Sequence, residues 1–234
     1  MTGYNQPMRY FHHGTSLYWL AYFVLPVISL FAQTNPSHRA DTKADPHQVF
    51  LSRLSAVAIE RTHHTVRYDP GYVGIAYPNG DVPADSGVCS DEVIRSYRAL
   101  GIDLQPLVHE DMKKNLSAYP KGSRTLDRNI DHRRVPNLMA FFSRQGEKLP
   151  ITKRAADYSP GDLVTWDLDP KRGIPHIGIV VDQKSPQSGR YMIVHNIGDG
   201  PQMEDVLFDW KITGHYRYYG PEKIEPGKIE SLNH

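Results

Sequence analysis

The sequence predicts an α+β fold, with helices in the first part of the domain and an antiparallel sheet in the second. Between residues 47 and 145, apolar residues recur at the spacing of amphipathic helices. Between residues 162 and 219, short apolar or alternating segments are separated by turns rich in proline and glycine. Helices and strands segregated along the chain in this way are typical of α+β domains, with N-terminal helices packed on a C-terminal sheet.

Four helices are expected in the first part. The first spans residues 47–62, and the second begins at Cys89 and ends near residue 100. A third covers about residues 107–116, directly after a proline, and the fourth spans residues 136–145. The fourth begins with proline and is followed by glycine, which is the favoured asymmetry for helix ends.

One short strand is expected early, over residues 65–68, and the remaining strands come later. Residues 162–167 alternate, and residues 177–181 and 191–196 are continuous apolar runs, so these three segments are expected to form an antiparallel meander. Residues 215–219 are expected to add a last, edge-like strand.

The N-terminus carries an apolar stretch over residues 17–32 that has the length of a signal-peptide core and is short for a membrane span. We therefore expect residues 1–32 to be a signal peptide, with an uncleaved anchor as the alternative. Residues 33–46 are expected to be a linker, residues 47–220 the domain, and residues 221–234 a tail. Both interpretations place the domain outside the cytoplasm, in the periplasm or the extracellular space.

Charge argues against nucleic acid as a partner. The 234 residues include 27 lysines and arginines against 26 aspartates and glutamates, and no basic block stands out. The chain contains a single cysteine, Cys89. Exported proteins usually carry paired cysteines or none, so a lone cysteine calls for an explanation.

Cys89 is the strongest candidate for a catalytic residue. It follows a long loop rich in glycine and proline, and it falls in the first turn of the expected helix. Free N–H groups and the helix dipole at this position favour a thiolate, which predicts a lowered thiol pKa. The alternative is a small buried apolar residue with no chemical role.

Two histidines lie at the ends of neighbouring strands. His176 begins one apolar strand and His195 closes the next, so a hairpin between them brings the two side chains within hydrogen-bond reach. This geometry suits a base and the residue that orients it. Each histidine alone is more often structural, and a metal held by His176, His195 and a nearby carboxylate is a further alternative.

Other polar residues are weaker candidates. Asp91 is expected to stabilise the helix dipole, and it is the rival to His195 for the third catalytic position. Tyr77, in the loop before the cysteine, and Asn196, next to His195, are candidates for catalysis or substrate binding. The segments 109–111 and 131–134 are expected to be solvated faces or loop salt bridges, without an assigned role. The histidine pairs 12–13 and 63–64 lack the spacing of a helical zinc site, and no metal site is predicted.

Two motifs resemble NlpC-type cysteine peptidases, which are papain-like enzymes that cut peptidoglycan peptides. Residues 161–164 read Gly-Asp-Leu-Val and residues 176–180 read His-Ile-Gly-Ile-Val, similar to a strand pair of those enzymes. Through this resemblance Cys89 matches their nucleophile, His176 their base, and His195 the polar third residue. The chain departs from their pattern in the long insertion between Cys89 and His176, which leaves the shape of the substrate cleft open.

The chain is also similar to a YijF-like bacterial family whose function is unknown. This resemblance spans about residues 50–218 and is carried by five motifs: Gly87-Val88-Cys89-Ser90-Asp91, Val108-His109-Glu110-Asp111-Met112, Asn129-Ile130-Asp131-His132-Arg133-Arg134-Val135-Pro136-Asn137-Leu138, Val194-His195-Asn196-Ile197-Gly198 and Lys211-Ile212-Thr213-Gly214-His215-Tyr216-Arg217.

Together the resemblances imply an exported papain-like cysteine hydrolase that cleaves an amide or peptide bond of the cell wall by acyl transfer. No cofactor is expected, and no stable membrane association is expected after signal cleavage. A non-catalytic cell-wall binding module of the same fold and a histidine-based metal-binding protein remain the alternatives.

Overall fold

The computed structural model describes residues 45–123 and 125–221. The expected signal peptide, all but the last residues of the expected linker and nearly all of the expected tail lie outside the described residues. Within the described part of the chain, no helix is long and apolar enough to cross a membrane.

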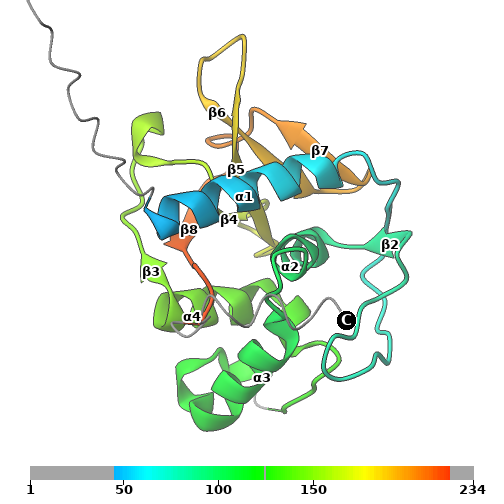
Figure 1. The fold of residues 1–234 in the computed structure, drawn as a ribbon. Helices are drawn as coiled ribbons and strands as arrows, with labels where there is room; N and C mark the ends of the chain where they lie inside the picture. Colours follow the sequence, from blue (N-terminus) through cyan, green and yellow to red (C-terminus); the bar gives the residue numbers. More distant parts are fainter. Residues whose placement is uncertain (1–44, 124, 222–234) are drawn as a thin grey trace, which may run out of the picture. The chain divides into compact units, whose positions relative to one another are not determined.

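Four α-helices lie on one face of the main sheet or stack behind it (Figure 1): α1 (Pro46–Arg61), α2 (Cys89–Arg98), α3 (Leu104–Lys114) and α4 (Val135–Gln145). All four match helices expected from the sequence. Helix α3 begins earlier than its proline indicates, because Asp103 caps it by accepting the backbone N–H of the second helical residue at 3.1 Å. Short 3₁₀ turns complete the helical part: η1 (Leu116–Ala118), η2 (Lys121–Ser123), η3 (Asp131–Arg133) and η4 (Ala155–Asp157).

Six antiparallel strands form the main sheet, in the order β3-β8-β4-β5-β6-β7. The hairpins β4-β5 and β5-β6 confirm the meander expected from the alternating segments. A separate pair, β1 and β2, is parallel and joins the chain before the long loop to the residues just before Cys89. The strands are β1 (Arg67–Tyr68), β2 (Ser86–Gly87), β3 (Glu147–Lys148), β4 (Leu163–Asp167), β5 (Pro175–Lys184), β6 (Tyr191–Asn196), β7 (Pro201–Glu204) and β8 (Lys211–Arg217).

The last strand is not at an edge, contrary to the sequence expectation. Strand β8 lies between β3 and β4, with Tyr216 opposite Leu163 on one side and Lys148 on the other. It occupies this inner position because both flanking strands supply partners for its backbone, and the side chain of Tyr216 is buried. The two edges are instead formed by β3 and β7, which the sequence did not predict. The α+β fold class, with N-terminal helices on a C-terminal antiparallel sheet, is confirmed.

Both faces of the sheet are covered by apolar cores. Ile177, Ile179 and Val194 pack toward the helices, whereas Val180 and Ile193 belong to a second core on the opposite face. Alternate residues of one strand therefore serve different cores, as strand geometry requires. Burial of each large apolar side chain stabilises the fold by about 1.5–3 kcal/mol, so the central strands are held firmly from both sides.

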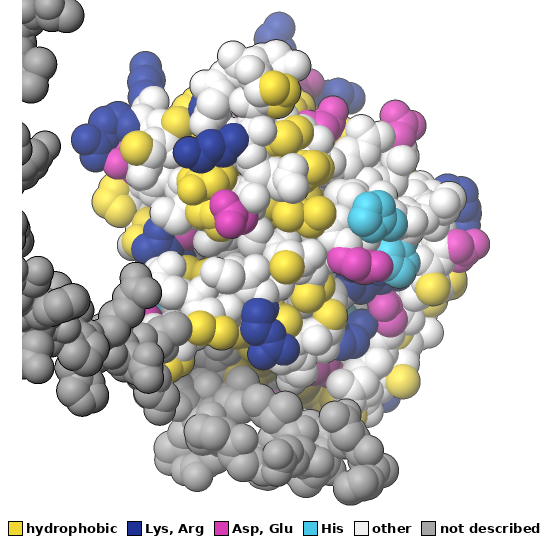
Figure 2. Space-filling model, turned by 45° about the horizontal axis from the view of Figure 1, so that its top comes forward, with side chains coloured by type: hydrophobic (Ala, Val, Ile, Leu, Met, Phe, Trp, Pro, Cys, Tyr) yellow, Lys and Arg dark blue, Asp and Glu magenta, His cyan; other side chains and the backbone are white. Residues whose placement is uncertain are grey.

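The surface mixes the two signs of charge. On the face drawn in Figure 2, lysines and arginines, acidic side chains and scattered apolar side chains alternate without a large block of one sign. This pattern agrees with the nearly balanced charge of the whole sequence.

A buried histidine lies in the turn η3, between α3 and α4. His132 is 1% exposed, and its Nδ1 atom has no hydrogen-bond partner within residues 45–123 and 125–221. Burial lowers the pKa of His132 to about 4, because the charged imidazolium would lose its hydration. The folded protein therefore holds this side chain neutral across a pH range in which an exposed histidine is charged.

This burial makes the free energy of unfolding depend on pH. Unfolded His132 takes up a proton near pH 6.5, whereas folded His132 does so only at about pH 4, so between these values the unfolded state binds more protons and stability falls as the pH falls. Between about pH 6.5 and pH 4, we expect the free energy of unfolding of His132→Gln to fall by up to about 3 kcal/mol less than that of the parent protein. Urea unfolding at both ends of the window measures the difference. The exposed His63→Gln is the matched control, and an equal pH dependence in parent and His132→Gln would contradict the assignment.

Candidate active site

Cys89 is the first residue of α2, as the sequence predicts. Val88 caps the helix in an extended conformation, and its N–H donates to the Asp91 carboxylate at 2.7 Å. Asp91 in turn accepts two hydrogen bonds from Arg133, at 2.8 and 3.0 Å, which tie the helix start to η3. Asp91 thus caps α2 and anchors its start to η3.

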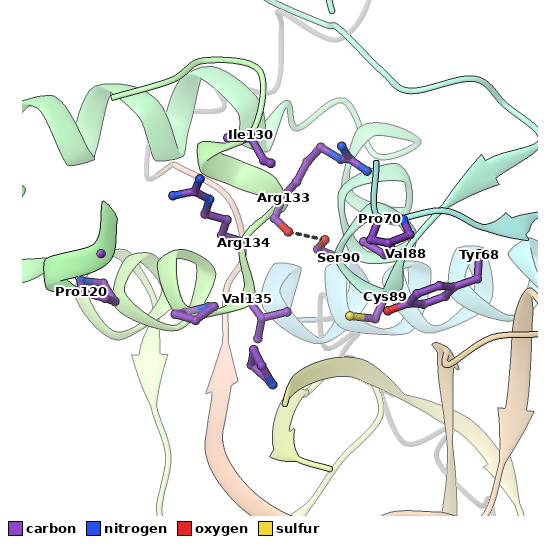
Figure 3. Close-up of a pocket in the computed structure, with 13 residues that line it drawn as sticks. Tyr68, Pro70, Val88, Cys89, Ser90, Pro120, Ile130, Arg133, Arg134 and Val135 are labelled. Atoms are coloured by element: carbon purple, nitrogen blue, oxygen red, sulfur yellow. Dashed lines mark hydrogen bonds between the residues drawn. The ribbon is translucent and has the colours of Figure 1, made fainter. Parts of the chain in front are cut away.

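Cys89 opens into a cleft of about 450 Å³ between α2, η3 and the start of α4. Figure 3 shows its sulfur beside the ring of Tyr68, with Val135 across the cleft. The cleft wall is fixed by the Ser90 hydroxyl, which donates to the Arg133 carbonyl at 2.6 Å. The lining is mostly apolar, with two arginines: Tyr68, Pro70, Val88, Cys89, Ser90, Pro120, Gly122, Ile130, Arg133, Arg134, Val135, Pro136 and Pro175.

His176 and His195 are in direct contact, as the hairpin geometry predicts. The Nε2 atom of His176 lies 2.8 Å from Nδ1 of His195, and both side chains are buried. His195 directly follows Val194, which is opposite Ile179 in the last pair at this end of the β5-β6 ladder, and His176 lies near the start of β5, before Ile179. Strand ends rather than loops therefore hold the pair, which gives it a rigid frame.

Gly178 makes this contact possible. A Cβ atom at residue 178 would lie 2.7 Å from Cγ2 of Ile193, 2.9 Å from the carbonyl oxygen of Val194 and 3.1 Å from Cβ of His195. These distances are too short for any side chain without displacement of the neighbouring strand. The glycine of the His-Ile-Gly-Ile motif thus lets β6 approach β5 closely enough for the imidazoles to meet.

A glutamate extends the histidine pair. Glu204 at the end of β7 lies with one carboxylate oxygen 2.9 Å from Nε2 of His195. Its side chain is 40% exposed, whereas that of His195 is 1% exposed. Sequence reasoning missed Glu204 because it did not predict β7, whose pairing with β6 brings the carboxylate to this position.

The thiol and the histidines approach the strand β5 from different directions. His176 shares the sheet face of Trp166 and Trp210, whose ring centroids lie 6.0 and 6.2 Å from its own. Cys89 comes from the helical side, and the backbone N–H of Ile177, the residue after His176, lies close enough to the thiol to lower its pKa against the larger effect of burial. Among the hydrogen bonds of the described residues, none joins the thiol to His176 directly.

Burial sets the charge state of both groups. It raises the pKa of Cys89 to about 12, although the N–H groups of Ile177 and of the helix start oppose the shift. Burial, followed by the neighbouring His195, lowers the pKa of His176 to about 3. The resting pair is a neutral thiol and a neutral imidazole. The expected lowered thiol pKa is therefore wrong, because loss of hydration outweighs the helix dipole at this buried site.

Tyr77 and Tyr68 lie in different places. Tyr77 is not among the cleft-lining residues: its hydroxyl is 3.4 Å from Glu110, and its ring packs edge-on against His109 on α3. Tyr68, at the end of β1, lines the cleft beside Cys89 and was not a sequence candidate. The sequence predicted a strand over residues 65–68, but it gave no sign that this strand would lie beside Cys89, which is about 20 residues further along the chain.

Asn196 supports the backbone around the cysteine. Its side-chain nitrogen lies 3.5 Å from the carbonyl oxygen of Gly87, and its side-chain oxygen accepts the N–H of Gly198 at 3.2 Å. Asn196 is fully buried, so it connects the end of β6 to the segment that leads into α2.

The segment 131–134 is largely buried and the segment 109–111 is partly buried, so they are not solvated faces, and both form the salt bridges expected as the alternative. Asp131 is fully buried and lies 2.9 Å from Nδ1 of His109. Asp111 accepts from Tyr119 at 2.7 Å and from Arg144 at 2.9 Å. These interactions link α3 to η3 and α4 from within. The residues are polar because they form a hydrogen-bonded network behind the cleft, and not because they face water.

Comparison with known proteins gives a family and one close relative. The model of a family described as "Domain of unknown function (DUF1287)" matches residues 55–218. A protein of Escherichia coli (strain K12), described as "Uncharacterized protein YijF", is 52% identical over 157 residues, which cover 66% of this chain and 75% of that protein.

Similarity to solved structures is much weaker. NlpC2 and NlpC1 of Trichomonas vaginalis give TM-scores of 0.41 and 0.39 at 16% and 17% identity, and this chain spans only 47% and 44% of their lengths. An N-acetylmuramoyl-L-alanine amidase of Bacteroides uniformis gives 0.40 at 12% identity and is covered over 97% of its length. Scores and identities this low do not transfer a function.

The raised thiol pKa can be tested by alkylation. We expect iodoacetamide to alkylate Cys89 at about pH 6 more slowly than it alkylates free cysteine, with a rate that rises through the alkaline range, because only the thiolate reacts. His176→Asn is the matched comparison and should leave the rate at about pH 6 unchanged, since a neutral imidazole does not stabilise a thiolate. Faster alkylation than free cysteine, lost in His176→Asn, would show an ion pair instead.

Proposed function

This chain belongs to the family described as a domain of unknown function (DUF1287), and we propose that it is an exported cysteine hydrolase that cleaves an amide or peptide bond. The YijF-like resemblance seen in the sequence motifs is confirmed by the family match and by the 52% identity to YijF. Since that family has no assigned activity, the proposal rests on the chemistry of Cys89 and of the histidine pair.

One observation carries the proposal. His176 and His195 form a buried hydrogen-bonded pair, and Ile177, the residue directly after His176, places its backbone N–H next to Cys89, the only cysteine of the sequence. A nucleophile, a base and a residue that orients the base are the parts that thiol-dependent acyl transfer needs. The cysteine opens into a cleft of about 450 Å³, which is large enough for part of a peptide.

The proposed reaction requires the Cys89 thiol and Nδ1 of His176 to come within hydrogen-bond distance of each other when the substrate is bound. His176 accepts the thiol proton while the sulfur forms a bond to the amide carbonyl carbon. The carbonyl oxygen becomes negatively charged and is stabilised by backbone N–H groups at the start of α2, including that of Cys89. The C–N bond then breaks, and the proton on His176 passes to the leaving amine.

The second half of the reaction regenerates the site. Water attacks the thioester carbon and gives a proton to His176, the C–S bond breaks, and the sulfur recovers that proton as the acid product leaves. His195 keeps the ring of His176 oriented through their 2.8 Å hydrogen bond. Because both groups begin neutral, the proton transfer accompanies sulfur attack rather than preceding it.

The proposed substrate is a peptide of the cell wall that carries a free carboxylate. Arg133 in the cleft is paired with Asp91, whereas the half-buried Arg134 has no ion-pair partner within the described ranges 45–123 and 125–221. A guanidinium that makes no ion pair among the described residues, although its charge acts on the Asp127 carboxylate at longer range, favours an acidic ligand in a mostly apolar cleft. Peptidoglycan peptides meet this requirement, and the apolar stretch over residues 17–32 would deliver the domain to them.

Two other functions are tested by the same site. A non-catalytic wall-binding module would keep binding but lack turnover. A metal site at the histidines is not favoured by the geometry, because the nitrogens of His176 and His195 point toward each other and Glu204 continues the line instead of converging with them. Elemental analysis of the purified protein addresses this second alternative.

The nucleophile is tested with Cys89→Ala. We expect kcat/KM on purified peptidoglycan or its soluble peptides to fall by at least about 1,000-fold, since no other group can form the thioester. Mass spectrometry of the fragments identifies the bond cut by the parent protein. The melting temperature and circular dichroism spectrum should stay close to those of the parent, because the change removes one small atom. Undiminished turnover by folded Cys89→Ala would exclude the thiol mechanism.

The carboxylate preference is tested with Arg134→Gln. For an acidic peptide we expect KM to rise about tenfold, while kcat changes little, because a charge-assisted hydrogen bond contributes about 1.5–3 kcal/mol to binding. The same peptide with its carboxylates amidated should bind parent and variant equally. Arg53→Gln, an equal change of charge at an exposed position of α1, is the control. Equal KM values for the acidic peptide in parent and Arg134→Gln would contradict this role.

A further inference from the structure

Three side chains on three adjacent strands form an unbroken line of hydrogen bonds. His176 on β5 contacts His195 on β6 at 2.8 Å, and His195 contacts Glu204 on β7 at 2.9 Å. Each imidazole uses its Nε2 atom toward the next residue, and Nδ1 of His195 receives the contact from His176. The Nδ1 atom of His176 is therefore the one ring nitrogen of the pair that this line leaves available.

The carboxylate of Glu204, at the end of this line of hydrogen bonds, determines which ring nitrogens carry the hydrogens. A carboxylate has no proton to donate, so Nε2 of His195 must carry the hydrogen of the bond to Glu204. A neutral imidazole carries only one N–H, which leaves Nδ1 of His195 as an acceptor. Nε2 of His176 must then be the donor to that acceptor, and Nδ1 of His176 is left with its lone pair free.

We propose that Glu204 is a positioning residue that fixes the tautomers of both histidines and thereby leaves Nδ1 of His176 unprotonated. The catalytic consequence rests on the proposed function, because Nδ1 of His176 is the atom that would take the proton from Cys89. Glu204 touches neither the thiol nor the cleft, and it acts on the base only through His195.

The assignment of tautomers requires both imidazoles to be neutral, because an imidazolium carries a hydrogen on each nitrogen. Both imidazoles are nearly inaccessible to water, and burial lowers the pKa of each. If His195 were instead a cation, both of its nitrogens would be donors, His176 would have to accept at Nε2, and its Nδ1 would carry the hydrogen. The two arrangements have the same heavy-atom positions and differ only in where the hydrogens lie.

Glu204 can be replaced without opening the core, since its side chain is 40% exposed at the edge strand. Glu204→Gln can still accept from His195 through its amide oxygen. Glu204→Lys can only donate, so it would force the opposite tautomers and put the hydrogen on Nδ1 of His176. Gln202→Lys is the matched control: it adds the same charge on β7, at the exposed residue directly opposite His195, and leaves Glu204 in place.

The first measurement needs no substrate. Two-bond ¹⁵N–¹H correlation spectra of the ¹⁵N-histidine-labelled full-length chain, assigned with His176→Asn and His195→Asn, report the protonated nitrogen of each ring. We expect both rings to be neutral with the hydrogen on Nε2 in the parent, in Glu204→Gln and in Gln202→Lys. In Glu204→Lys we expect both hydrogens on Nδ1. A parent protein with a cationic His195, or with the hydrogen on Nδ1 of His176, would overturn the proposal even if Glu204→Lys does not fold.

The second measurement is kcat/KM on a peptidoglycan peptide. We expect Glu204→Gln to lose less than about fivefold and Glu204→Lys to lose at least about 100-fold, since a base that already carries the proton cannot accept another. Gln202→Lys should lose less than about fivefold. A purely structural role for Glu204 would instead make Glu204→Gln as harmful as Glu204→Lys, and would leave the tautomers of a folded Glu204→Lys unchanged.

The two measurements separate the possible failures. Tautomers that follow the prediction in a protein without hydrolytic activity would overturn the proposed function and support the role of Glu204. If hydrolysis depends on Cys89 but the histidine tautomers are the same in the parent and in Glu204→Lys, the proposed function is supported and the role of Glu204 is overturned.

Discussion

The hydrogen bond between His176 and His195 depends on a close approach of two strand ends, and the rest of the site is arranged around it. Gly178 permits the approach because any side chain there would meet the backbone and side chains of β6. The apolar cores on both faces of the sheet then hold β5 and β6 in this register. A rigid sheet is thus the source of the precise alignment, in keeping with the stronger positioning that strands give over loops.

The cleft depends on a second, independent connection. The Asp91–Arg133 ion pair joins the start of α2 to η3, and the Ser90 hydroxyl reinforces the joint through the carbonyl of the same arginine. Both ends of the pair are nearly inaccessible to water, so removing either one would leave a buried charge without its partner. The insertion between cysteine and histidine, whose role the sequence left open, therefore builds one wall of the cleft and anchors it beside the thiol.

The sequence was sufficient for elements with local signals and insufficient for those that depend on distant contacts. Helical periodicity located the start of α2 and therefore Cys89, and two apolar runs located His176 and His195 at adjacent strand ends. The sequence did not predict strand β7, and therefore missed Glu204, because the strand is only four residues long and its alternation rests on one proline and one methionine. Tyr68 reaches the cleft through a two-residue parallel pairing with β2, which no local pattern reveals. The sign of the thiol pKa shift was missed because it depends on burial by the whole fold.

The burial of Cys89 also governs how the protein withstands oxidants. Peroxides and disulfides react with thiolates that they can reach, and they convert a thiol stepwise into sulfenic, sulfinic and sulfonic acids. Cys89 is 4% exposed as a residue, and burial raises the pKa of its thiol to about 12, so it offers little of the reactive thiolate. The chain has no second cysteine that could trap a sulfenic acid as a disulfide. Shielding by the fold, rather than repair by a partner thiol, is therefore this chain's own protection for Cys89 against oxidants.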